Sequence, residues 1–155
     1  MRIDKLESPP QWLLDAETED ADVEIADGIV HWYDGVWKYG TWEGGVWHYG
    51  SFESGTWKDG VWKDGVWRKG IWENGTWEIG IWVSGTWNCG TWESGIWEGG
   101  TWQDGIWKNG VWGGGIWQDG DWKDGKWYRG LWCRGTWEKG RLARFFPSDM
   151  PPSND

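Results

Sequence analysis

The sequence of 155 residues has few of the features that usually define an enzyme or a secreted domain. Its two cysteines, Cys89 and Cys133, lie far apart, without a CxxC pair or a nearby histidine, so neither a disulfide framework nor a zinc site is expected. No apolar run reaches the length of a signal peptide or a membrane span. We therefore expect a cytoplasmic protein or a component of an assembly such as a virion, with no membrane partner.

The residues in excess, 22 tryptophans and 27 glycines, follow one strict pattern. Glycine falls on every fifth position from Gly35 to Gly140. Tryptophan does so from Trp32 to Trp137, with Phe52 as the one substitution. The unit is [Val/Ile/Thr]-Trp-x-x-Gly, and 21 such pentads fill residues 36–140. A period this regular predicts a repeat architecture.

Each position of the pentad has a physical interpretation. The first is mostly β-branched, which favours extended backbone, and tryptophan follows on the opposite face of the strand. The fourth is often Asp, Asn or Ser, which with the fixed glycine forms a tight corner. A helix is excluded, because a glycine at every fifth position would cost about 1 kcal/mol each.

The tolerance of each position predicts which face is buried. The first position accepts Ser51, Asp121 and Lys126, whereas the tryptophan position accepts nothing smaller than Phe52. Because an interior tolerates charge poorly, we expect the tryptophans to fill the core. The fold class predicted is therefore all-β, a β-solenoid with a tryptophan-filled interior.

Two arguments from the sequence disagree on the number of residues in one coil. Third-position charges fifteen residues apart are of opposite sign seven times and of like sign twice, while at twenty residues like pairs predominate. The interior volume favours twenty residues per coil. A five-residue side is about 16 Å long, so a triangular layer encloses about 200 Å³ for side chains and a square layer about 700 Å³. Indoles fill about 160 Å³ each. We expect a quadrilateral β-helix of about 20 residues per coil; a flattened 10-residue coil and an antiparallel β-hairpin meander are the alternatives.

The pentad resembles known repeats. Gly60-Val61-Trp62 is similar to the centre of the pentapeptide-repeat family, whose members form quadrilateral β-helices, although that family uses Leu or Phe with Ala. Residues 33–40 and 128–135 also look like MORN repeats, with the pattern Tyr-x-Gly-x-Trp-x-x-Gly. The Trp-Gly pentads also resemble those of uncharacterised bacterial and phage proteins, a resemblance that implies no activity. The first resemblance implies a solenoid.

The termini differ from the repeat, and three segments are expected. Residues 1–35 form an acidic segment with a capping hairpin around Asp27-Gly28, preceded by an extended apolar stretch from Pro9 to Leu14. Residues 36–140 form the solenoid. Residues 141–155 form a C-terminal cap and tail, in which Phe145-Phe146 folds over the last coil; the alternative is that the segment is a docking peptide for a partner.

Few residues suggest a catalytic, cofactor-binding or metal-binding site. His31 and His48 occupy outward positions without a recurring partner, and aspartates such as Asp59 and Asp64 are explained by turn geometry. No phosphate-binding loop and no nucleophile–base pair is apparent. We therefore expect no catalytic, cofactor-binding or metal-binding residues, no cofactor, no small-molecule substrate and no enzymatic activity.

The charge distribution along the chain indicates which kind of partner the protein binds. The net charge is −10; residues 1–30 carry nine acidic and two basic side chains, and residues 123–144 carry seven basic and two acidic ones. Opposite charge at the two ends favours a structural or scaffolding module in a larger assembly, bound to protein partners or to itself through its ends. Two alternatives stay open: a DNA mimic that inhibits a DNA-binding enzyme, as some pentapeptide-repeat proteins do, and glycan or nucleic-acid binding through exposed tryptophan. Nucleic acid is the less expected partner.

Overall fold

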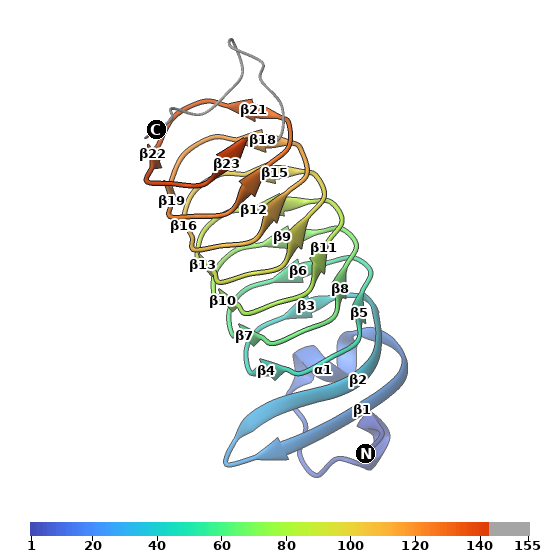
Figure 1. Cartoon of the computed structure of the whole chain (residues 1–155). Helices are drawn as coiled ribbons and strands as arrows, with labels where there is room; N and C mark the ends of the chain where they lie inside the picture. The colour runs from blue at the N-terminus through green and yellow to red at the C-terminus, as the bar shows by residue number, and fades with distance from the viewer. Residues whose placement is uncertain (143–155) are drawn as a thin grey trace.

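A computed structural model describes residues 1–142 of the chain, which form a rod closed at one end by an N-terminal cap (Figure 1). The cap contains the 3-10 helix η1 (Ile3–Lys5), the short helix α1 (Gln11–Asp15) and the antiparallel strands β1 (Glu17–Ala26) and β2 (Ile29–Tyr39). The rod is a parallel β-solenoid of about seven turns. The repeat therefore forms the all-β solenoid that its sequence predicts.

The solenoid has three faces, each built from two-residue strands that stack along the rod. The first face contains β4 (Val46–Trp47), β7 (Val61–Trp62), β10 (Thr76–Trp77), β13 (Thr91–Trp92), β16 (Ile106–Trp107), β19 (Asp121–Trp122) and β22 (Thr136–Trp137). The second contains β5 (Ser51–Phe52), β8 (Val66–Trp67), β11 (Ile81–Trp82), β14 (Ile96–Trp97), β17 (Val111–Trp112), β20 (Lys126–Trp127) and β23 (Arg141–Leu142). The third contains β3 (Thr41–Trp42), β6 (Thr56–Trp57), β9 (Ile71–Trp72), β12 (Thr86–Trp87), β15 (Thr101–Trp102), β18 (Ile116–Trp117) and β21 (Leu131–Trp132).

Each coil takes fifteen residues, so the expectation of a twenty-residue quadrilateral coil is wrong. Trp77 pairs in parallel with Trp62 below it and Trp92 above it, and the same register holds on all three faces. The parallel pairing of the repeat strands equally contradicts an antiparallel meander, and the register contradicts a ten-residue coil. The charge pattern at fifteen residues indicated the correct coil, and the volume argument did not.

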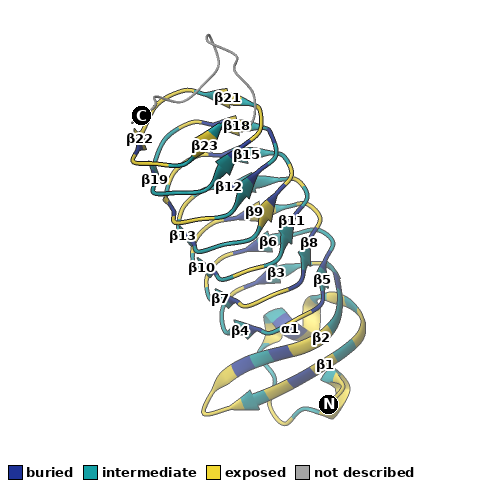
Figure 2. Cartoon of the chain, in the orientation of Figure 1, coloured by how far each residue is buried: buried dark blue, intermediate teal, exposed yellow. Residues whose placement is uncertain are grey.

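The interior is a set of three tryptophan columns. Every repeat tryptophan from Trp32 to Trp127, together with Phe52, has no exposed surface, while the first position of each pentad faces outward (Figure 2). Within a column, Trp82 stacks on Trp67 at 4.7 Å between ring centroids and 5° between ring planes. Between columns it meets Trp77 edge to face at 5.9 Å. Offset stacks and edge contacts are the arrangements that aromatic rings prefer, so the columns support one another.

The volume argument failed because an indole is not confined to its own layer. The Nε1 atom of Trp77 reaches the next coil, where it donates a hydrogen bond to the carbonyl of Ser94 at 3.2 Å. It lies beside Gly95, where an added Cβ would stand 3.3 Å from the indole nitrogen. The corner glycines thus provide the room that a flat-layer calculation leaves out.

The N-terminal cap begins the stacking for the coils above it. The hairpin turns at Asp27-Gly28, both with positive φ, as expected for a two-residue turn. Strand β2 continues into the first coil, because Trp32 pairs with Trp47 of β4 and Trp37 with Phe52 of β5. The stretch expected to be extended from Pro9 to Leu14 instead includes α1. Phe145 and Phe146, expected to cover the last coil, lie outside the described residues.

Candidate interaction surfaces

Helix α1 and its tryptophan form the base of the rod. Trp12, the one tryptophan outside the repeat, packs on Trp42 at 5.1 Å between ring centroids and on Trp37 at 6.3 Å. Leu13 beside it is fully buried. The helix therefore covers the first coil with apolar side chains, a role that the sequence left unassigned because Trp12 obeys no repeat.

Met1 covers part of the outer edge of the hairpin. Its amino group donates a hydrogen bond to the carbonyl of Val23 at 2.9 Å, and the N–H of Val23 donates one to the carbonyl of Met1 at 2.7 Å. These two hydrogen bonds satisfy backbone groups at the edge of β1 that could otherwise pair with another strand. Addition of a partner strand at this position would have to displace Met1.

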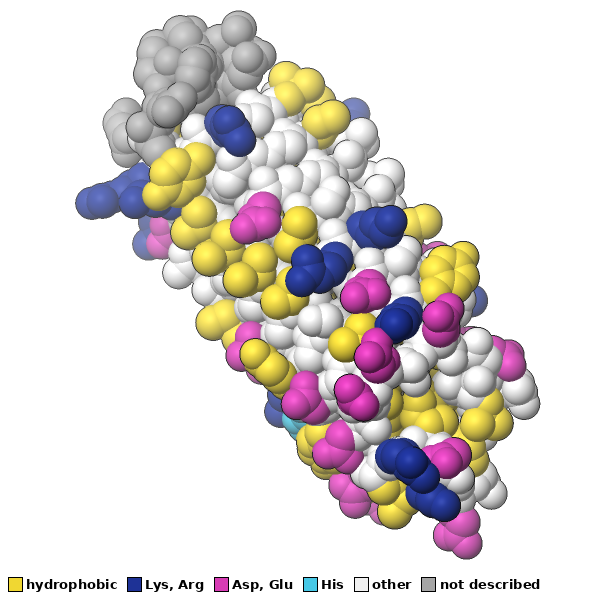
Figure 3. Space-filling model, turned by 90° about the vertical axis from the view of Figure 1, so that its right-hand side faces the viewer, with side chains coloured by type: hydrophobic (Ala, Val, Ile, Leu, Met, Phe, Trp, Pro, Cys, Tyr) yellow, Lys and Arg dark blue, Asp and Glu magenta, His cyan; other side chains and the backbone are white. Residues whose placement is uncertain are grey.

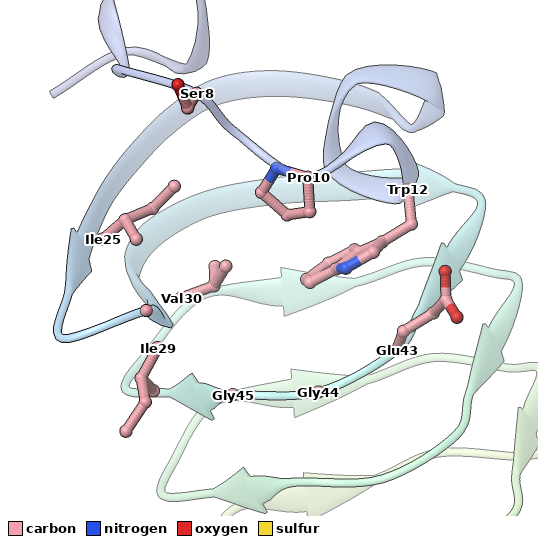
Figure 4. Close-up of a pocket in the computed structure, with 10 residues that line it drawn as sticks. Ser8, Pro10, Trp12, Ile25, Ile29, Val30, Glu43, Gly44 and Gly45 are labelled. Carbon is pink, nitrogen blue, oxygen red and sulfur yellow. The ribbon is translucent and has the colours of Figure 1, made fainter.

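The groove in Figure 4 lies between the cap and the first coil of the solenoid. It has a volume of about 460 Å³ and is lined by Ser8, Pro10, Trp12, Ile25, Gly28, Ile29, Val30, Glu43, Gly44 and Gly45. Pro10, Trp12 and Val30 present apolar surface to it, and Glu43 places a carboxylate at its rim. Ile29 is 46% exposed there. The groove thus combines an aromatic wall, aliphatic side chains and one acidic group.

The histidines that the sequence presented as isolated are in contact. His31 Nδ1 and His48 Nε2 are 3.0 Å apart, and the ring of Tyr33 stacks on His48 at 4.6 Å between centroids. Burial, the charge of His31 and the charge of Lys63 lower the pKa of His48. A hydrogen bond to the Glu24 carboxylate raises the pKa of the Tyr33 hydroxyl. Counting in coils of fifteen residues places His48 above Tyr33 in one column, and His31 precedes Tyr33 by two residues.

The corner aspartates act in turns. The Oδ1 atoms of Asp59 and Asp64 each accept a hydrogen bond from the N–H of the following glycine, at 2.9 and 2.7 Å. Asp104, Asp119 and Asp124 do the same. The prediction from turn geometry is confirmed. Within residues 1–142, no three histidine, cysteine or acidic side chains gather as a metal-binding group.

The indole N–H groups of the three faces differ in their hydrogen bonding. Tryptophans of the first and second faces from Trp77 to Trp122 donate to corner carbonyls of the next coil at 3.0–3.2 Å. In the part of the chain that the structure describes, indole nitrogens of the third face such as Trp72 and Trp87 are buried without such a partner. These rings therefore stabilise the rod through apolar and stacking contacts alone.

The outer surface carries charged columns and one apolar strip. Lys123 pairs with Glu138 at 3.3 Å, and Lys108 with Glu93 at 3.7 Å, each across fifteen residues. On the second face the first positions are apolar over four consecutive coils: Val66, Ile81, Ile96 and Val111. Hydrophobic side chains gather at mid-height in the view of Figure 3, with charged residues around them.

Comparison with protein-family models, with curated proteins and with solved structures gave no match. The resemblance to pentapeptide repeats extends to a repetitive β-solenoid with one inward aromatic residue in each five-residue side. The fifteen-residue coil differs from that family's quadrilateral form. Among residues 1–142, no helix is both long and apolar enough to cross a membrane.

Proposed function

We propose that the chain is a non-enzymatic structural module, a rigid rod that engages protein partners through its ends within a larger assembly. The observation that carries this proposal is the contrast between core and ends. The repeat tryptophans are buried in the interior, and the side faces carry charges of both signs, as in the pairs Lys108–Glu93 and Lys123–Glu138. The N-terminal end has a groove lined by apolar side chains, of which Ile29 is exposed.

Rigidity supports the same proposal. Three continuous ring columns and a backbone hydrogen bond such as Glu78 N–H to Trp62 carbonyl, 2.7 Å long, tie each coil to the next. Seven coils spaced by about 4.8 Å give a rod of about 34 Å. A rod of fixed length with chemically different ends suits a spacer or connector.

The experiment compares two kinds of substitution in tagged protein recovered from its source cells. Ile29→Ser with Glu43→Arg changes the groove, and Ile71→Ser changes an isoleucine of equal exposure, 45%, on the third face. We expect specific co-purifying proteins to persist with Ile71→Ser and to be lost with the groove variant. Loss with Ile71→Ser and retention with the groove variant would contradict the proposal.

No specific observation favours the other two functions. Burial of the repeat tryptophans argues against a stacking platform for glycans or bases. A DNA mimic requires a continuous acidic surface, whereas one column of the first face contains Lys108 and Lys123 paired with Glu93 and Glu138. A salt-sensitive competition between this protein and duplex DNA for a DNA-binding enzyme would revive that alternative.

A further inference from the structure

The groove at the N-terminal cap selects a particular kind of ligand. Its wall is the ring of Trp12 with Pro10 and Val30, and its rim carries Glu43 and the exposed Ile29. Such a surface fits one or two aromatic side chains with a neighbouring cation. A phenylalanine side chain occupies about 130 Å³ at interior packing density, so two fit the groove of about 460 Å³.

The sequence itself contains a segment with this chemistry. Residues 144–147 read Arg-Phe-Phe-Pro and directly follow the described part of the chain. Phe145 and Phe146 match the apolar wall, and Arg144 matches the carboxylate of Glu43. The segment and the groove are therefore complementary in both polarity and size.

The two cannot meet within one chain. The groove includes Gly44 in the first coil, and Leu142 lies in the last, more than six coil spacings away, or about 31 Å. Phe146 follows Leu142 by four residues and reaches at most about 14 Å from it. Only a second copy can bring its segment to the groove.

Charge at the two ends favours the same pairing. Acidic side chains surround the groove end, with Glu7 and Asp27 next to residues that line it and nine acidic residues in positions 1–30. At the other end, Arg129, Arg134 and Arg141 are exposed. Opposite ends of two rods therefore attract, which speeds association and sets its direction.

We propose that the cap groove binds the Phe145-Phe146 segment of a second copy, with Arg144 of that copy beside Glu43, and so joins the rods head to tail. The inference rests on the proposed function and specifies its partner. Because the contact joins different surfaces of the two copies, it leaves a free groove and a free segment, and it extends into an open series.

Sedimentation velocity tests this contact with full-length chains. Wild type should form a concentration-dependent series of species larger than two copies. A groove variant, Ile29→Ser with Glu43→Arg, and a tail variant, Phe145→Ser with Phe146→Ser, should each be monomeric, and Ile71→Ser should behave as wild type. Ile29→Ser alone should raise the dissociation constant of the contact about tenfold. Tryptophan emission and circular dichroism confirm that each variant is folded.

Mixing the two defective variants gives the decisive result. The groove variant keeps its tail and the tail variant keeps its groove, so the mixture should form a complex of two chains and nothing larger. Glu43→Arg combined with Arg144→Glu in one chain should recover association lost in either single variant. Monomeric wild type at millimolar concentration, or a mixture that stays monomeric, would overturn the contact. Retained binding of other proteins through the groove would then leave the proposed module function intact.

Discussion

Two adjacent glycines of one pentad should respond to alanine in opposite ways. Gly100 has φ +109°, and a Cβ built on it would lie 2.3 Å from the carbonyl oxygen of Gly85 in the coil below. Gly99 has no positive φ, and its Cβ would meet only the carbonyl oxygen of Val83, at 3.6 Å. The first substitution breaks the stacking of the coils, and the second leaves it intact.

The magnitude follows from the backbone contacts at this corner. A non-glycine residue at such a φ costs about 1–3 kcal/mol. The Gly85 carbonyl also accepts the N–H of Thr101 at 2.9 Å. Moving the coils apart at this oxygen would break that hydrogen bond. Leaving its buried N–H and carbonyl unsatisfied would cost about 1–3 kcal/mol more. We therefore expect Gly100→Ala to lower the free energy of unfolding by roughly 2–6 kcal/mol, and Gly99→Ala to raise it by up to about 1 kcal/mol.

Urea denaturation followed by tryptophan emission and by circular dichroism measures both effects. Because repeat proteins can unfold in more than one step, the midpoints of the two probes should be compared before a free energy is extracted. Equal midpoints for Gly99→Ala and Gly100→Ala would refute the account of the corner. A larger loss at Gly99 would refute it as well.

Three further predictions concern the core and the cap. Trp82→Ala should lower the free energy of unfolding by about 3–5 kcal/mol in the same assay, because the ring is fully buried and stacked on both sides; an effect below about 1 kcal/mol would contradict the stacked core. Phe52→Trp should raise the thermal midpoint, since Phe52 lies 5.9 Å from the ring of Trp37 where other column neighbours lie closer; a lower midpoint would show that the phenylalanine site is already full. The lowered pKa of His48 means that its contribution to stability is present above the ordinary value of 6.5 and lost as pH falls below it. Urea midpoints at pH 7.5 and 5 should therefore differ less in His48→Gln than in wild type, and an unchanged difference would exclude the histidine pair as the cause.

The local structure of the repeat was predictable because each pentad position has one physical requirement. The inward placement of tryptophan followed from the tolerance for Asp121 and Lys126 at the first position, and burial confirms it. The turn role of Asp59 followed from the Asp-Gly pair. These inferences need only the alternation of strand side chains and the chemistry of corners.

The coil length was not predictable from volume, because the calculation placed each indole within a single layer. Trp77 instead leans toward the next coil beside Gly95, where the missing side chain leaves room. The third-position charges carried better information, because Lys123 and Glu138 do meet across fifteen residues. Weak contacts repeated along a column indicated register more reliably than a packing estimate.

The groove could not be derived from the sequence at all. It depends on where the short helix α1 packs, and five residues of helix have no periodicity that predicts a partner. The contacts of Trp12 with Trp37 and Trp42 hold α1 on the first coil, where Pro10 lines the groove together with Gly44 and Gly45. Sites formed between an irregular cap and a repeat require the three-dimensional arrangement.

Disulfide trapping tests the three-sided coil most directly. In a chain with Cys89→Ser and Cys133→Ser, cysteines at Glu78 and Glu93 occupy stacked positions of the first face, because Trp77 pairs with Trp92. Neighbouring strands are about 4.8 Å apart, within the Cα separation that a disulfide accepts. Cysteines at Glu78 and Glu98 would be stacked only in a twenty-residue coil. We predict rapid oxidation of the 78–93 pair and none of the 78–98 pair; the reverse result would contradict the fifteen-residue coil.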